Sequence, residues 1–350
     1  MERATKPNLS NQMKKHASAV NNKKEEYDGN FGRVISTGST QLDLAISGGR
    51  IHKGGLPGGI LVEIFGPSGS GKTVLLSEIG GAVQRQGGEL MIRDPEARIN
   101  KRFAKLFDLD IDEKNYSRPN TIPEVFSAVR YWNPPAKAGV IHGIITDGLA
   151  ALSTDQEMEN KEGDKMGMRR AKEFSEELRK TCRILADKNY LMVCSNQVRV
   201  NIDAGPYGQK YSAPGGESIG FYSSLRLRTL SPQKITEKRT VSGQEVKRVV
   251  GVKVQVEVYK SSIWKPYRTA PVTIIFDYGI DDIQDCLQFI KDHSRENVYH
   301  LDGQALAKSM KEAISIVEKE KLEESLRKQV ILKWNEIESQ FDSQRKPKTR

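Results

Sequence analysis

One eight-residue segment constrains the fold of this chain more than any other. Residues 66–73 read Gly-Pro-Ser-Gly-Ser-Gly-Lys-Thr, which matches the phosphate-binding pattern GxxxxGK[ST]. A largely apolar run, 60–65, precedes the segment, and apolar residues at helical spacing follow it from Val74 to Val83. Since a P-loop joins a buried strand to a helix, both neighbours are of the kind that the motif requires. The sequence therefore predicts an α/β nucleotide-binding protein.

Each residue type in this segment has a chemical task. Glycines let successive backbone N–H groups face a phosphate, and the following helix adds the positive end of its dipole. Lys72 is expected to reach the β and γ phosphates of ATP, and the Thr73 hydroxyl to ligate Mg²⁺. A glycine turn without a ligand is the alternative. The expected nucleotide-binding residues here are Gly66, Pro67, Ser68, Gly69, Ser70, Gly71, Lys72 and Thr73.

Strand and helix patterns alternate after the loop. Strands are predicted at 89–93, 143–147 and 190–195, and helices at 100–107, 122–131 and 168–187. Such alternation predicts a mainly parallel sheet with helices on both faces. Three further strand patterns, at 224–230, 249–258 and 272–276, predict an antiparallel extension of a mixed sheet, with 231–248 as a charged loop.

The two ends of the chain differ from this core in composition. Residues 1–33 are polar and basic and are expected to form an arm that serves oligomerisation. The core is expected to cover 34–280, and 281–350 to form a helical region with a basic tail. Within it, the segment 304–341 is either one small domain or a long amphipathic helix that packs back or onto a partner.

Charge and composition limit the setting. Lys and Arg number 55 and Asp and Glu 45, a net charge of +10, and basic chains tend to bind polyanions such as nucleic acids. Surplus surface lysines are the alternative. We expect no membrane-spanning helix and no secretory signal, because no apolar stretch is long enough. A reducing cytoplasm is the expected location, because Cys182, Cys194 and Cys286 are an odd number of cysteines without CxxC spacing, which argues against a disulfide framework.

Carboxylates follow two of the predicted strands. Asp147 ends the strand at 143–147, where an acid beside the P-loop can hold Mg²⁺ through water; a loop-capping aspartate is the alternative. Asp94 and Glu96 follow the strand at 89–93. Glu96 is the better candidate for a general base, because it can lean over the γ-phosphate. A surface salt bridge is the alternative for Glu96.

Taken in order, these motifs resemble the core of the RecA recombinase family. The resemblance spans about residues 34–280 and rests on the P-loop and on the segments 35–39, 42–43, 54–59, 94–97, 146–152, 195–199 and 214–216. The chain is identified as a divergent member, of the kind found in phages or mobile elements. The resemblance implies a RecA-like fold, ATP with Mg²⁺, and a helical homo-oligomer on single-stranded DNA. It also implies homologous pairing with duplex DNA and strand exchange.

The resemblance further implies roles for individual residues. Glu96 would activate the attacking water, and Gln197 would couple the γ-phosphate to a second DNA-binding loop. Phe103 falls where the family stacks an aromatic ring on adenine, and Asn100 lies near the base. Lys260 would reach the ATP of the adjacent protomer. The bacterial proteins have a second lysine near the one that Lys260 matches, and this chain has Ser262 at that position. One cation that would stabilise the negative charge developing during hydrolysis is therefore missing.

Two loops are the expected DNA contacts. In the first, 155–170, cations would neutralise phosphates and a methionine would wedge between bases; a solvated helix start is the alternative. In the second, 199–217, glycines with interleaved basic and aromatic residues suit a single strand followed along its backbone. The expected DNA-binding residues are Lys165, Met166, Arg169, Arg170, Lys172, Arg199, Asn201, Tyr207, Lys210, Tyr211, Gly215 and Gly216.

Two other functions remain open. A recombination mediator or regulatory ATPase would share the core without strand exchange, and a hexameric helicase-like motor shares the fold. The presence together of Lys72, Glu96, Asp147 and Gln197, with two basic glycine-containing loops, favours the strand-exchange ATPase.

Overall fold

A computed structural model describes residues 32–135, 137–154, 157–158, 166–200, 211–212, 217–343 and 345. The chain divides into two compact units, Met1–Gly32 and Arg33–Arg350, and the elements below belong to the second. Nearly all of the expected arm at 1–33 and of the basic tail lies outside the described residues. So do six expected DNA-binding residues: Lys165, Asn201, Tyr207, Lys210, Gly215 and Gly216. The boundaries at 33/34 and 280/281 stay predictions.

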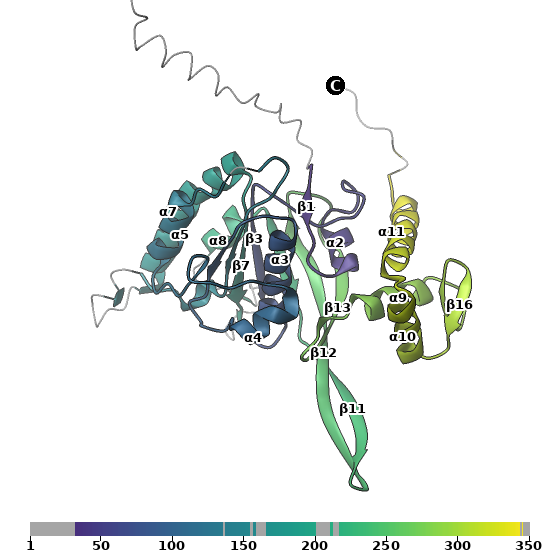
Figure 1. The fold of residues 1–350 in the computed structure, drawn as a ribbon. Helices are drawn as coiled ribbons and strands as arrows, with labels where there is room; N and C mark the ends of the chain where they lie inside the picture. Colours follow the sequence, from purple (N-terminus) through teal and green to yellow (C-terminus); the bar gives the residue numbers. More distant parts are fainter. Residues whose placement is uncertain are drawn as a thin grey trace, which may run out of the picture. The chain divides into compact units, whose positions relative to one another are not determined.

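The described residues form a ten-stranded sheet whose larger part is parallel. In spatial order this part contains β10 (Leu225–Thr229), β3 (Ile60–Gly66), β7 (Leu191–Gln197), β6 (Gly143–Thr146), β4 (Leu90–Arg93) and β5 (Tyr116–Ser117). Each neighbouring pair is parallel, so the carboxyl ends of β3, β4, β6 and β7 meet at one edge (Figure 1). Ligands bind at such edges in α/β proteins.

Helices cover both faces of this sheet, as predicted (Figure 1). On one face, α5 (Ile122–Tyr131), α7 (Met166–Lys188) and α8 (Glu217–Tyr222) bury an apolar cluster that includes Phe126, Phe174 and Ile144. On the other face, Gly80 of α3 (Lys72–Arg85) approaches the side chain of Ile145. Ile144 and Ile145 face opposite sides because successive side chains alternate along a strand. The predicted mixed, mainly parallel α/β fold is confirmed.

An antiparallel extension follows β10, also as predicted. It contains β12 (Gln244–Ser261), β13 (Thr269–Ile275) and β14 (Gly279–Ile280), and β11 (Gln233–Val241) pairs with β12. The expectation of a charged loop at 231–248 is wrong, because β11 and β12 form a long hairpin that projects beyond the sheet (Figure 1). Nearly all of β11 is exposed, so no apolar alternation marks it in the sequence.

The C-terminal elements pack back onto the core rather than forming one long helix. They are α9 (Asp282–Asp292), β15 (Tyr299–Leu301), β16 (Gln304–Ala307), α10 (Met310–Glu320) and α11 (Glu323–Gln340). Lys321, at a left-handed φ of 56°, separates the last two helices. Their apolar residues form one cluster with α9 and with Leu44 of α2 (Thr40–Ser47). The segment 304–341 is therefore not one long helix, and it packs back within the same compact unit as the core.

Short elements complete the unit. They are β1 (Val34–Ile35), β2 (Leu56–Pro57), α4 (Lys101–Ala104) with the 3-10 turn Lys105–Phe107, the 3-10 turn Leu149–Ala151, β8 (Arg199–Val200) and β9 (Tyr211–Ser212). The strands β8 and β9 pair antiparallel, which places the start of the expected second DNA loop beside its residues 211–212. Among the described residues, no helix has the length and apolar character needed to span a bilayer.

Candidate nucleotide-binding site

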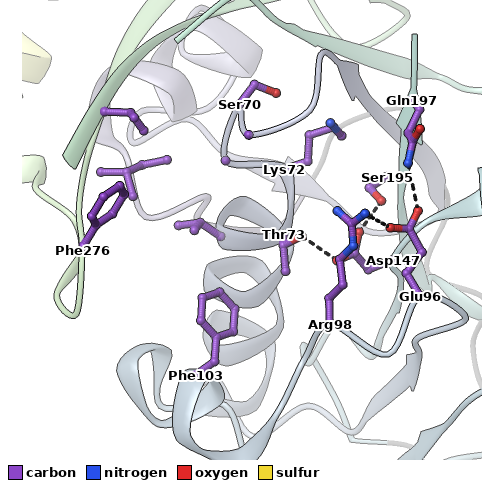
Figure 2. A pocket seen from close by; sticks show the side chains of 15 residues that line it. Ser70, Lys72, Thr73, Glu96, Arg98, Phe103, Asp147, Ser195, Gln197 and Phe276 are labelled. Atoms are coloured by element: carbon purple, nitrogen blue, oxygen red, sulfur yellow. Dashed lines mark hydrogen bonds and ion pairs between the residues drawn. The ribbon is translucent and has the colours of Figure 1, made fainter. Parts of the chain in front are cut away.

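A pocket of about 340 Å³ opens at the edge where the parallel strands end. Its polar side holds residues from the P-loop, from the segments that follow β4 and β6, and from the last part of β7 (Figure 2). The lining residues are Gly69, Ser70, Gly71, Lys72, Thr73, Val74, Glu96, Arg98, Phe103, Asp147, Ser195, Gln197, Val252, Ile274 and Phe276. The structure thus brings Lys72, Thr73, Glu96, Asp147, Gln197 and Phe103 together, as the sequence predicted.

The P-loop has the backbone that its glycines allow. Gly69 and Gly71 have φ values of 72° and 78°, in the left-handed region that glycine tolerates best. The Lys72 ammonium donates to the carbonyl oxygens of Gly66 and Pro67, at 3.0 and 2.8 Å. Burial lowers the pKa of Lys72, while the negative charge of Asp147 opposes that shift. A negatively charged ligand would favour the charged lysine in the same way.

Asp147 lies beside the P-loop and is 3% exposed. The Thr73 hydroxyl donates to its Oδ2 at 2.6 Å, and the Ser195 hydroxyl to its Oδ1 at 2.5 Å. Hydroxyl and carboxylate oxygens are hard donors of the kind that Mg²⁺ prefers. This donor set therefore fits the expected cation. The sequence analysis did not single out Ser195, because one serine at a strand end carries no motif.

The two acids after β4 have different surroundings. Asp94 is fully buried, and its carboxylate accepts the backbone N–H groups of Arg98 and Ile99 and the Tyr116 hydroxyl. It therefore holds the turn. Glu96 lines the pocket instead, which agrees with the choice of Glu96 as the candidate base.

Glu96 has a polar partner on each carboxylate oxygen (Figure 2). The Gln197 amide donates to Oε1 at 3.4 Å, and Arg98 Nη2 lies 2.5 Å from Oε2. The contact between Glu96 and Gln197 joins two residues that the sequence analysis chose separately. Arg98 was missed; its position two residues after Glu96 was the available signal, but no spacing rule marks it.

Apolar side chains line the part of the pocket away from Glu96. Phe103 comes from α4, Val252 and Ile274 from the antiparallel strands, and Phe276 from the residue after β13 (Figure 2). The sequence analysis predicted Phe103 but none of the other three. Asn100 is the N-cap of α4. Its side-chain Oδ1 accepts the backbone N–H of Phe103 at 3.0 Å.

Few of the expected DNA-binding residues have described side chains. On α7, Arg169 and Lys172 are exposed, and the Lys172 ammonium lies 4.0 Å from Glu176. Arg170 donates to the carbonyl oxygens of Leu149 and Ala150, at 3.1 and 2.6 Å. For the remaining three, the structure places the backbone: Met166 begins α7, Arg199 begins β8 and Tyr211 begins β9.

Lys260 lies near the end of β12. Its ammonium donates to the carbonyl oxygens of Gly220 and Phe221, both at 2.9 Å. These two carbonyls are near the C-terminal end of α8, where a helix dipole favours a cation. In a single chain, Lys260 therefore stabilises the helix that follows the second loop.

Comparison with known proteins gives four further findings. The model of the RecA N-terminal domain matches residues 10–281. Protein RecA of Thermus aquaticus is 34% identical over 255 residues, which cover 72% of this chain and 69% of that protein. Protein RecA of Borrelia hermsii is 32% identical over 303 residues, covering 84% and 81%. Among solved structures, the RadB recombinase aligns with a TM-score of 0.47 and 20% identity, over 71% of this chain and 98% of that one.

Proposed function

This chain belongs to the RecA family, and from that premise we propose that it is an ATP-dependent recombinase. It would assemble as a helical homo-oligomer on single-stranded DNA, pair that strand with a homologous duplex, and exchange strands. The observation that carries the proposal is the convergence of Lys72, Thr73, Glu96, Asp147 and Gln197 on one pocket. Each comes from a different part of the sequence, apart from the adjacent Lys72 and Thr73, and each has the chemistry that nucleotide hydrolysis needs.

The pocket suits a nucleoside triphosphate. Backbone N–H groups of the P-loop would cradle the phosphates, and Lys72 would turn from its two loop carbonyls to the β and γ oxygens. Thr73 and Asp147 would hold Mg²⁺, which when bound neutralises phosphate charge. Phe103 would stack on the base, and Asn100 would position Phe103 through the helix cap. Lys260 would reach the nucleotide of an adjacent protomer.

Glu96 would act as the general base. Water attacks the γ phosphorus, its proton passes to Glu96, and the bond from that phosphorus to the β–γ bridging oxygen breaks, which leaves ADP and phosphate. Gln197 is the last residue of β7, and β8 begins two residues later. A change in the contacts of the Gln197 amide would therefore move the start of the second DNA loop.

The DNA contacts would come from the two loops near this edge. Arg169 and Lys172 are the stronger candidates of α7, because both are exposed. Arg170 is the weaker candidate, because its guanidinium already serves two backbone carbonyls. Met166, Arg199 and Tyr211, and the six residues outside the described ranges, keep the roles that the sequence analysis gave them.

The test is electron microscopy of the full chain with single-stranded DNA, Mg²⁺ and ATPγS, together with a strand-exchange assay in ATP. We expect filaments and joint molecules, and neither from Lys72→Ala, which removes the phosphate contact. If filaments form without joint molecules, the result would favour the alternative function, a recombination mediator or regulatory ATPase. Closed rings would favour the helicase-like motor, and a monomer under all conditions would overturn the proposal.

A further inference from the structure

We propose that Arg98 is a second phosphate-binding cation of the pocket, and that without a triphosphate it holds Glu96 out of use. The inference rests on the proposed ATP hydrolysis and adds a step to it. A triphosphate would draw the guanidinium away from Glu96 to its terminal phosphate. The same movement would release the base and bring a positive charge to the reacting group.

The turn after β4 fixes where Arg98 can lie. The buried Asp94 carboxylate accepts the Arg98 N–H at 3.1 Å and the Ile99 N–H at 2.8 Å. Between Glu96 and Arg98, Ala97 has a φ of 54°, a conformation that few residues other than glycine adopt. This backbone brings the Glu96 and Arg98 side chains together at the pocket (Figure 2). The placement of Arg98 is therefore built into the turn.

In this arrangement Glu96 cannot serve a water molecule freely. Its Oε2 is paired with Arg98 at 2.5 Å, and its Oε1 accepts from Gln197 at 3.4 Å. A general base needs an oxygen within hydrogen-bond reach of the proton that it takes. The contact to Arg98 is the shorter of the two. Movement of the guanidinium away from Glu96 would therefore free Oε2 to accept a proton.

The two partners differ in their freedom to move. The Arg98 side chain is 51% exposed, whereas that of Glu96 is 11% exposed. Because half of the arginine side chain is exposed, water can solvate its guanidinium when it leaves the glutamate. We therefore expect the arginine to move and the glutamate to stay. A guanidinium also presents a planar set of donors that matches phosphate oxygens.

The electrostatics of the pocket point the same way. Lys72 and Arg98 both line it, so two positively charged side chains face the same cavity. Two cations that repel each other across a pocket are both stabilised by an anion between them. The terminal phosphate of a triphosphate is such an anion, and a diphosphate lacks it.

A purely structural ion pair would have different consequences. It would stabilise the turn equally with any nucleotide, so its loss would not change the preference of the pocket for a triphosphate over a diphosphate. The ratio of the two affinities is therefore the quantity to measure. Arg102 offers a matched control, because it is an exposed arginine in the helix that follows this turn.

The experiment is calorimetric titration of the full chain with ATPγS and with ADP, both with Mg²⁺, alongside steady-state ATP turnover. We expect Arg98→Gln to weaken ATPγS binding at least about tenfold and to change ADP binding less than about twofold. We expect its kcat to fall by about 10²-fold. Arg98→Lys should recover part of both losses, and Arg102→Gln should match the parent.

A double-mutant cycle tests the release of Glu96. Glu96→Gln removes the partner that holds the guanidinium, so ATPγS should bind more tightly, and most of that gain should vanish when Arg98→Gln is added. An unchanged ratio of affinities in a folded Arg98→Gln protein would overturn the inference, and so would an increased kcat. If the parent itself binds neither nucleotide, the proposed function fails; if only the Arg98 effects are missing, it survives.

Discussion

Two of the regions that bury carboxylates in this molecule differ in what holds those carboxylates. At the pocket, Glu96 and Asp147 are held by other side chains: an arginine, a glutamine and two hydroxyls. A ligand can replace each of these partners without moving the backbone. The second region lies where α2 meets β13, α9 and α11, and we call it the seam. Its acids are Asp43, Asp282 and Asp285.

Each seam acid accepts a backbone N–H group in addition to its side-chain partners. Asp282 accepts the N–H and the hydroxyl of Thr40, both at 2.7 Å, and pairs with Arg327 at 3.2 Å. Asp285 accepts the N–H and the hydroxyl of Thr273, again both at 2.7 Å. A backbone N–H group cannot leave its carboxylate unless the helix or strand that carries it moves. Between these two regions, the acids held by side chains alone are available to a ligand, whereas the acids that also accept a backbone N–H group serve the fold.

The sharpest test of this distinction is Glu96→Gln. The amide keeps the shape of the side chain but cannot take a proton, so ATP turnover should fall by about 10²–10⁴-fold. Thermal unfolding should change little, because no backbone group depends on Glu96. Turnover and melting curves measured on the same preparation check both parts. A parental rate would remove Glu96 from the role of base.

The next effect belongs to the seam. Asp282→Ala leaves the Thr40 N–H without its acceptor and Arg327 without its partner, so the free energy of unfolding should fall by about 2–4 kcal/mol. Urea denaturation measures this change. Asp292→Ala, an exposed acid at the end of the same helix α9, should change it by less than about 0.5 kcal/mol. Equal losses for both variants would contradict a structural role for the seam.

The sequence predicted these two regions unequally. Each pocket acid follows a strand that a local apolar run reveals, and the P-loop is itself a local pattern. Once these strands pair in parallel, their carboxyl ends bring the acids and the P-loop together. Asp282 and Thr40 are 242 residues apart, and no local pattern joins them. The β11–β12 hairpin was missed for the opposite reason, since its exposed residues have no buried face to reveal a strand. Arg98 lines the pocket, but its position depends on the backbone turn at Ala97, which no sequence pattern revealed.

The pH dependence of stability should also separate the two regions. Burial raises the pKa of Asp43 to about 7 despite its hydrogen bonds from Ser36 and Thr37, and burial raises that of Asp285 to about 6. A carboxyl with a raised folded-state pKa binds more protons when folded. Its stabilising contribution is therefore complete below the ordinary aspartate pKa of 3.8 and is lost as the pH rises to about 7.

Asp43→Asn tests this sign. The amide cannot titrate and can still accept from Thr37, so the drop in unfolding free energy between pH 5 and pH 8 should shrink by about 2–3 kcal/mol. Urea denaturation at the two pH values, for parent and variant, gives the comparison. An identical drop in both proteins would mean that Asp43 is charged throughout.

The smallest effect is expected from a carboxylate that belongs to neither region. Glu245, on the hairpin, lies 2.8 Å from Lys238, with both side chains more than 60% exposed. Water solvates both charges in the folded and unfolded chain, so Glu245→Gln should change the unfolding free energy by less than about 0.5 kcal/mol. ATP turnover without DNA should equal that of the parent. A larger effect that persists in high salt would contradict this expectation. It would show that the ion-pair distance, rather than the partners and burial of a carboxylate, sets its contribution to stability. The contrast between pocket and seam would then lose its basis.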